Sequence, residues 1–324
     1  MESSPFKYDL QLDLSQANNS HVLQLELTGQ NKIVLDVGCA TGYLGEALVR
    51  RGCRVVGVEA DPAAAAAASR VYEAVFVADL DQVDLTATLA GARFDVVIFG
   101  DVLEHLKDPD RLLAQAQVLL AKDGYVVASI PNIAHASVSL ALLRGEFRYQ
   151  ERGLLDSTHL RFFTLDSIRA MFERAGYTLT AVHRSERGPF DTEVGIKPGD
   201  FPQQVVDWAL QHTEARTYQF VVQARPRSSP AAPASLPRFD AKVVSVTPRG
   251  TTPLQDNLLR QMQSFYEQER ERVRYETQLE QKRVALEQKA GDLERRLRRY
   301  QNLPFMRTAR WLRRKLLRLP ETPG

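Results

Sequence analysis

The stretch VLDVGCATG, residues 34–42, decides the fold expected of this chain. A strand ending in Asp36 gives way to a loop of small residues, and a helix is predicted to begin near Tyr43. Gly38 and Gly42 have no side chain, so the loop backbone can approach a ligand closely. The G-x-G-x-x-G spacing of dinucleotide sites is absent, and the Asp36 carboxylate favours a cationic ligand over a pyrophosphate.

Strand-like and helical segments alternate around this stretch, up to about residue 225. Several strand-like runs are near-continuous in Val and Ile, as in parallel strands buried on both faces. The alternation predicts an α/β fold with a doubly wound, mostly parallel sheet. The predicted strands are 32–37, 54–59, 74–78, 94–99, 125–130 and 218–224, and the predicted helices include 44–51, 62–71, 111–120 and 165–175.

The composition is that of a globular protein. The chain has 324 residues, of which 44% are hydrophobic and 25% charged, and this excludes a wholly disordered chain. The formal net charge of +2 disfavours a basic nucleic-acid-binding protein. No apolar run reaches the ~18 residues of a membrane-spanning helix, and no secretory signal is visible. Cys39 and Cys53 are too few for a disulfide framework or a zinc site, which favours a cytoplasmic location.

Acidic residues end or follow three further predicted strands: Glu59, Asp79 and Asp101. Ligands of open α/β sheets bind beyond the carboxyl ends of the strands, so these residues and Asp36 are expected to meet at one edge. Glu59 is placed to accept hydrogen bonds from two ribose hydroxyls, and Asp79 from an adenine amino group, with Leu80 against the ring. The set predicts a site for an adenosine-containing cation.

Three motifs occupy the ends of the first, second and fourth predicted strands: LDVGCATG (35–42), VEAD (58–61) and GDVLEHL (100–106). In these motifs the chain resembles class I S-adenosylmethionine-dependent methyltransferases, over about residues 5–225. The resemblance implies a Rossmann-like fold, S-adenosylmethionine as cofactor, and cofactor contacts from Cys39, Ala40 and Thr41. Ala40 stands where the family most often has glycine, and because alanine is small we expect no loss of binding.

Two further motifs concern the acceptor: PNIAH (131–135) and DSTHLRFFT (156–164). They resemble methyltransferases that occur with bacterial surface-polysaccharide (O-antigen) glycosyltransferases. This resemblance implies O-methylation of a free or lipid-linked saccharide in surface-polysaccharide biosynthesis, and a glycosyltransferase as a partner.

A sugar hydroxyl is a poor nucleophile at neutral pH, so a general base is expected. Histidine suits this role, and His135 or His159 is the predicted base. A loop-pinning role through ring hydrogen bonds is the alternative for His159, and is the role predicted for His105. No carboxylate cluster stands out, so no metal site is predicted.

Arg152 and Arg161 are predicted to bind a phosphate or carboxylate on the acceptor. For Arg161, a salt bridge with Asp156 is the alternative.

After the predicted methyltransferase domain (1–225), residues 226–254 are rich in Pro, Ser and Ala, which predicts a linker. Within it, the run AKVVSVT resembles a strand but has no predicted place in the sheet. The sequence of residues 255–303 predicts a long helix. This helix would form a coiled coil, for self-association or for binding a partner, and a single solvated helix is the alternative. Residues 304–324 contain a basic amphipathic helix (304–319), which favours peripheral contact with the inner face of a membrane or docking on a protein. Residues 256–324 carry 17 basic and 10 acidic residues, whereas the rest is net acidic.

Other functions remain open at this stage. The GDVLEHL motif also suits methylation of a quinone-type phenol or of a carboxylate. A cofactor-binding scaffold that acts through its coiled coil is the non-enzymatic alternative. Nucleic-acid methylation is disfavoured, because no N/D-P-P-Y/F motif follows the fourth predicted strand and the body is net acidic.

Overall fold

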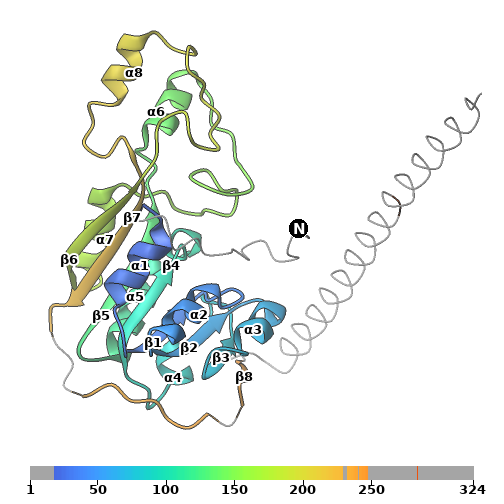
Figure 1. Cartoon of the computed structure of the whole chain (residues 1–324). Coiled ribbons are helices and arrows are strands. Elements are labelled where there is room, and N and C mark those ends of the chain that lie inside the picture. Colours follow the sequence, from blue (N-terminus) through green and yellow to red (C-terminus); the bar gives the residue numbers. More distant parts are fainter. Residues whose placement is uncertain (1–17, 229–231, 240, 247–282, 284–324) are drawn as a thin grey trace, which may run out of the picture. The chain divides into compact units, whose positions relative to one another are not determined.

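A computed structural model of the chain describes residues 18–228, 232–239, 241–246 and 283. The helices and strands given below belong to the unit Met1–Arg249. They form one mixed sheet, in the order β6-β7-β5-β4-β1-β2-β3-β8 (Figure 1). The strands are β1 (Ile33–Val37), β2 (Arg54–Glu59), β3 (Ala74–Val77), β4 (Phe94–Gly100), β5 (Leu120–Pro131), β6 (Tyr177–Glu186), β7 (Thr217–Pro226) and β8 (Val243–Ser245).

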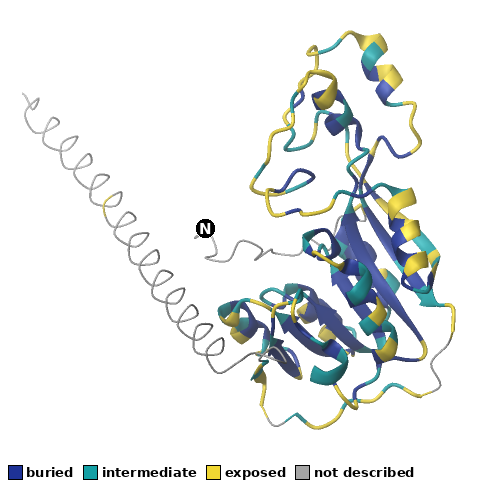
Figure 2. Cartoon of the chain, turned by 180° about the vertical axis from the view of Figure 1, so that it is seen from behind, coloured by how far each residue is buried: buried dark blue, intermediate teal, exposed yellow. Residues whose placement is uncertain are grey.

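The sheet is mostly parallel, as the sequence predicts. The pairs β1–β2, β1–β4, β2–β3, β3–β8 and β4–β5 are parallel, whereas β7 runs antiparallel to β5 and β6. The apolar runs of the central strands are buried on both faces (Figure 2). The strand order reverses between β1 and β4, and such a switch point opens a crevice at the carboxyl ends of the strands.

Helices cover both faces of the sheet (Figure 1). Alternate residues of β1 divide between two cores: Val34 packs with α1–α3, and Leu35 with α4, α5 and α7. A 3-10 turn, η1 (Leu103–His105), follows β4. The helices are α1 (Ser20–Thr28), α2 (Tyr43–Arg50), α3 (Pro62–Ala68), α4 (Leu85–Thr88), α5 (Pro109–Leu119), α6 (Ala136–Leu143), α7 (Leu165–Arg174) and α8 (Gln203–Ala209).

Two helix starts that the sequence predicts are confirmed. The Asp61 side chain accepts a hydrogen bond from the backbone N–H of Ala63, and Pro62 occupies the first turn of α3. Thr164 caps α7 and forms a reciprocal capping box with Ser167.

Of the two edge strands, β6 was not predicted, and β8 was expected only as a strand-like run without a place in the sheet. β6 is polar and largely exposed, because it borders a single neighbour, and it lacks the apolar run of a central strand. β8 lies inside the segment 226–254 that was predicted to be a linker, and it places the AKVVSVT run: Val243–Ser245 pairs with Val75–Val77 of β3. The segment 226–254 therefore returns to the sheet. There the three residues of β8 add an edge strand beside β3.

Helices α6 and α8 pack on each other apart from the sheet (Figure 1). Among the described residues, no helix has the length and apolarity needed to cross a membrane. The predicted coiled coil (255–303) and basic amphipathic helix (304–319) lie outside the described residues, apart from residue 283.

Candidate active site

A pocket of about 540 Å³ opens at the carboxyl ends of the parallel strands. Five successive strand ends contribute to its wall, which is where the sequence predicts a site. Its other walls come from η1, from the segment 152–159 and from β7. The lining residues are Gly38, Ala40, Tyr43, Glu59, Leu80, Gly100, Asp101, Val102, Glu104, His105, Leu106, Pro131, Arg152, Gly153, Asp156, Thr158, His159, Tyr218 and Gln219.

The loop after β1 is held against the end of β2. The backbone N–H of Gly38 donates to the Val58 carbonyl at 2.8 Å. Glu59 accepts from the N–H of Ala40 at 2.9 Å and, with its other oxygen, from the N–H of Asp61 at 2.8 Å. Each Glu59 oxygen keeps a further lone pair for a ligand. The geometry therefore suits the predicted role of Glu59 at a ribose.

Ala40 has a left-handed backbone conformation, with φ of +47°. Only glycine adopts this conformation without steric cost, which gives a physical reason for the glycine that the family most often has there. The alanine is compatible with the pocket, which it lines.

Asp36 lies beneath the pocket rather than in its wall. Its carboxylate is buried and accepts a hydrogen bond from the Tyr72 hydroxyl at 2.6 Å. Burial raises the pKa of Asp36 to about 6, the Tyr72 hydrogen bond opposes the shift, and the Glu59 charge adds to it. The structure thus gives Asp36 an internal partner outside the pocket lining, and its contact with a cationic ligand stays a prediction.

Four other predicted cofactor residues also fall outside the lining: Cys39, Thr41, Gly42 and Asp79. The Cys39 side chain is buried in the core under the loop, and both cysteines are free. The exposed carboxylate of Asp79 accepts from the N–H of Asp81 and the amide of Gln82, so it organises its own turn. Leu80 does line the pocket, as predicted.

Asp101 is held rigidly at the end of β4. Its backbone φ is +55°, and its N–H donates to Ser129 Oγ at 3.0 Å. Ser129 Oγ in turn donates to Asp101 Oδ1 at 2.7 Å, and Gln219 donates to the same oxygen at 2.7 Å. Two hydrogen bonds to Oδ1 thus fix this carboxylate in the pocket wall, and the third holds the Asp101 backbone.

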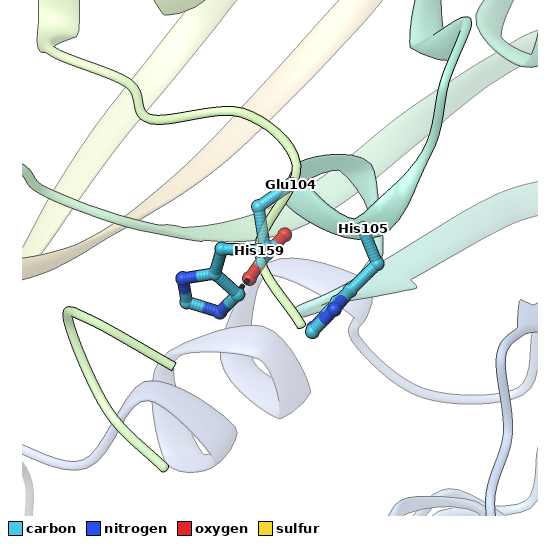
Figure 3. A group of neighbouring side chains, drawn as sticks. All are labelled: Glu104, His105 and His159. Carbon is cyan, nitrogen blue, oxygen red and sulfur yellow. Dashed lines mark ion pairs between the residues drawn. The ribbon is translucent and has the colours of Figure 1, made fainter. Parts of the chain in front are cut away.

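Across the pocket, η1 and the segment 156–159 bring together Glu104, His105 and His159 (Figure 3). One ligand atom of each lies within 4.8 Å of the others, and His159 Nε2 is 4.0 Å from Glu104 Oε1. Burial lowers the pKa of His159, and so does its neighbour His105, while a backbone hydrogen bond at Leu154 opposes the shift. A neutral imidazole that faces the pocket can accept a proton.

Glu104 is almost fully buried, with 1% of its surface exposed. Its backbone carbonyl accepts from the N–H groups of Leu160 and Arg161, which ties η1 to the segment that carries His159. Burial raises the pKa of the Glu104 carboxyl well above its usual range, and the charges of Asp101 and Asp156 add to this.

His105 does pin a loop, as predicted, because its Nδ1 lies 3.1 Å from the Thr158 carbonyl oxygen. It also lines the pocket, which the sequence did not predict.

His135 is not brought to the pocket. It is fully buried at the N-cap of α6, with Nδ1 2.8 Å from Ser137 Oγ and Nε2 3.1 Å from the Arg187 carbonyl oxygen. Both ring nitrogens serve the fold, so of the two predicted bases the geometry leaves His159.

The two predicted arginines separate. Arg152 lines the pocket. Arg161 instead directs its guanidinium to the backbone carbonyls of Leu106 and Lys107, which replaces both the predicted acceptor contact and the alternative salt bridge with Asp156.

Sequence reasoning missed much of the acceptor side. Gln219 and Tyr218 come from β7, and the polarity of that strand's start was the available signal. Glu104 was passed over although it stands beside a histidine in the GDVLEHL motif.

Comparisons with known proteins bear on this site. The family model described as "Methyltransferase domain" matches residues 11–182. A ubiquinone biosynthesis O-methyltransferase from Cereibacter sphaeroides is 31% identical over 180 residues, 54% of this chain and 72% of that protein. A protein of the same name from Psychrobacter arcticus is 34% identical over 170 residues, 50% of this chain and 64% of that protein.

Solved structures were compared as well. A methyltransferase from Archaeoglobus fulgidus has a TM-score of 0.45 at 16% identity, covering 64% of this chain and 94% of that one. A possible histamine N-methyltransferase from Thermotoga maritima has a TM-score of 0.46 at 17% identity, covering 65% and 90%.

Proposed function

Because this chain belongs to the methyltransferase-domain family and is an S-adenosylmethionine-dependent methyltransferase, we propose that it methylates a hydroxyl group of a small molecule. One observation carries the proposal. A single pocket is lined on one side by Glu59 and Asp101 and on the other by His105 and His159. A methyl donor and a hydroxyl acceptor can therefore meet in one enclosed space, which is the main requirement for methyl transfer.

The described residues suit the cofactor. Glu59 would accept from the ribose hydroxyls, Leu80 would pack on the adenine ring, and the fixed Asp101 carboxylate would face the cationic part of the molecule. When bound, S-adenosylmethionine supplies a methyl group whose carbon–sulfur bond breaks as an oxygen lone pair forms the new bond, leaving S-adenosylhomocysteine, a methyl ether and one proton. His159, the predicted base that lines the pocket, would receive that proton.

The acceptor class is proposed from the relatives and the motifs. The matched relatives are named ubiquinone biosynthesis O-methyltransferases, which favours a phenolic acceptor of the quinone-precursor type. The saccharide acceptor rests on the motifs 131–135 and 156–164. In the first motif, Pro131 lines the pocket, but Asn132 and His135 are buried in contacts within the fold. In the second motif, Asp156, Thr158 and His159 line the pocket. The phenol is therefore the first proposal and the saccharide the second.

A methyl-transfer assay separates these acceptors. The purified full chain is incubated with labelled S-adenosylmethionine and one acceptor at a time. The acceptors are a 3,4-dihydroxybenzoate and, in separate reactions, sugars from the reducing and non-reducing ends of surface polysaccharides. Label on the phenol alone supports the first acceptor, and label on a sugar alone supports the second. Tight S-adenosylhomocysteine binding with no transfer to either class would contradict both acceptor proposals.

The roles of the C-terminal residues remain proposals. Residues 255–303 would associate with a second copy or a glycosyltransferase, and 304–319 would bind an anionic membrane at its cytoplasmic face, because basic residues outnumber acidic ones there. We expect the full chain to sediment with anionic vesicles and to be released at high salt. Equal recovery in the supernatant with and without vesicles would contradict the membrane contact.

A further inference from the structure

Glu104 is a buried residue whose carboxylate receives no hydrogen bond from the described residues. Within the part of the chain that the structure describes, neither carboxylate oxygen of Glu104 has a hydrogen-bond partner. A buried charge is costly unless it is paired or coordinates a metal. Asp101 and Asp156, whose charges act on Glu104, are themselves acidic, so they increase the cost.

Two imidazoles lie beside this carboxylate. Figure 3 shows the Glu104 carboxylate directed toward the His159 ring, with the His105 ring next to them. The Glu104 Oε1 to His159 Nε2 separation of 4.0 Å is too long for a hydrogen bond. It matches two ligands of one ion, because bonds of about 2.0–2.2 Å place ligand atoms roughly 3–4.3 Å apart. All three ligand atoms lie within 4.8 Å of one another, so the side chains would have to draw slightly closer on binding an ion.

The residues around the imidazoles hold the rings in place. His105 Nδ1 is held at the Thr158 carbonyl oxygen, and a backbone hydrogen bond at Leu154 engages the His159 ring. The Asp156 carboxylate accepts from the N–H and the hydroxyl of Thr158, at 2.8 and 2.6 Å. These bonds fix the turn of residues 156–158 that leads into His159. Metal-binding histidines in proteins are oriented in this way, through the nitrogen that does not bind the ion.

We propose that Glu104, His105 and His159 bind a divalent transition-metal cation in the wall of the pocket. Two imidazoles and one carboxylate suit Zn²⁺, Mn²⁺ or Co²⁺, whereas Mg²⁺ and Ca²⁺ prefer sets of oxygen ligands. Three protein ligands leave coordination positions open, and here they open into the pocket.

The open coordination positions give the cation a role in binding the acceptor, and this role rests on the proposed function. The acceptor hydroxyl would occupy one of them, lose its proton to solvent more readily beside the positive charge, and keep its oxygen lone pair for the methyl carbon. His159 would then act as a ligand rather than as the base.

The test is a titration of the metal-stripped full chain with Co²⁺, followed by its visible absorption and by equilibrium dialysis. We expect one Co²⁺ per chain, displaced by Zn²⁺. In Glu104→Gln and His159→Gln, which keep side-chain size, we expect Co²⁺ affinity to fall at least about tenfold. His183→Ala is the matched control, because it removes an exposed histidine of β6 that does not line the pocket.

S-adenosylhomocysteine binding, measured on the same samples, checks that each variant is folded. Failure of the wild type to bind Co²⁺, or equal binding by the wild type and both ligand variants, would overturn the metal site. If methyl transfer persists in fully metal-free protein, the cation has no role in the reaction. Bound Co²⁺ without any methyl transfer would count against the proposed function and leave the metal site standing.

Discussion

On the cofactor side of the pocket, Glu59 and Asp101 lie at the ends of sheet strands, whereas on the acceptor side His105 and His159 come from segments outside the sheet. Glu59 and Asp101 end or follow β2 and β4. Backbone N–H groups donate to the Glu59 carboxylate, and side chains of β5 and β7 donate to the Asp101 carboxylate. His105 and His159 lie 54 positions apart, and Thr158 and the backbone carbonyl of Glu104 tie their segments together. The cofactor side is built by the sheet, and the acceptor side by contacts between loops.

The difference has a physical consequence. Strand ends are fixed by the ladder of the sheet, so a change to one side chain there should alter binding without moving its neighbours. Loop segments depend on a few side-chain contacts, so their geometry is open to change while the fold persists. Acceptor specificity can therefore vary on a constant cofactor site.

The largest effect is expected from His159→Ala. Loss of the residue at the centre of the acceptor side should lower kcat/KM by roughly 10²–10⁴-fold, whether His159 moves a proton or binds an ion. S-adenosylhomocysteine affinity, measured by calorimetry, should stay within about threefold, because the two sides are separate. His183→Ala should behave as the wild type. An equal loss of cofactor affinity would show that the two sides are not independent.

The buried carboxyl of Asp36, which does not line the pocket, should make the stability of the fold depend on pH. Its pKa is raised to about 6, so the folded state favours the protonated carboxyl. This contribution is fully present below about pH 4 and is lost as pH rises through 6. The cost of ionisation above pH 7 is on the order of 3 kcal/mol.

Asp36→Asn should remove this dependence. Urea unfolding at pH 4.5 and pH 8 should find the variant gaining stability relative to the wild type at the higher pH, with Tyr72 still able to donate to the amide oxygen. A difference between the two proteins that does not change with pH would mean that Asp36 ionises normally in the fold.

Glu59→Ala should weaken S-adenosylhomocysteine binding by roughly 1–3 kcal/mol, the loss of a charge-assisted hydrogen-bonding group. The variant also removes the acceptor for the N–H of Ala40 and so loosens the loop. Glu59→Gln keeps acceptor capacity and should lose less. An unchanged Kd in the alanine variant would remove Glu59 from the site.

The smallest effect belongs to Ala40→Gly. Glycine relieves the left-handed strain at φ of +47°, and its greater freedom in the unfolded chain offsets most of the gain. Stability by urea unfolding should change by less than about 1 kcal/mol, and cofactor affinity should be unchanged. A marked loss of affinity would mean that the methyl group of Ala40 contacts the cofactor.

Much of the fold followed from local patterns. The central strands were predicted from continuous apolar runs, and the predicted helix starts at residues 62 and 165 agree with the observed caps at Asp61 and Thr164. β6 was missed because an edge strand needs no apolar run. The run that contains β8 was noted as strand-like, but its three paired residues carry too little pattern to place it in the sheet. Both depend on pairing partners that lie far away in the sequence.

The sequence by itself determined the parallel sheet, the loop of residues 34–42 and the acidic strand end at Glu59, since burial and backbone freedom act over a few neighbouring residues. Tertiary structure alone decided which histidine faces the pocket. His135 and His159 are equally plausible in the sequence, but one is locked between Ser137 and Arg187, while the other meets Glu104. The reason is that a side chain's chemistry is set by its partners, and these come from segments that only folding brings together.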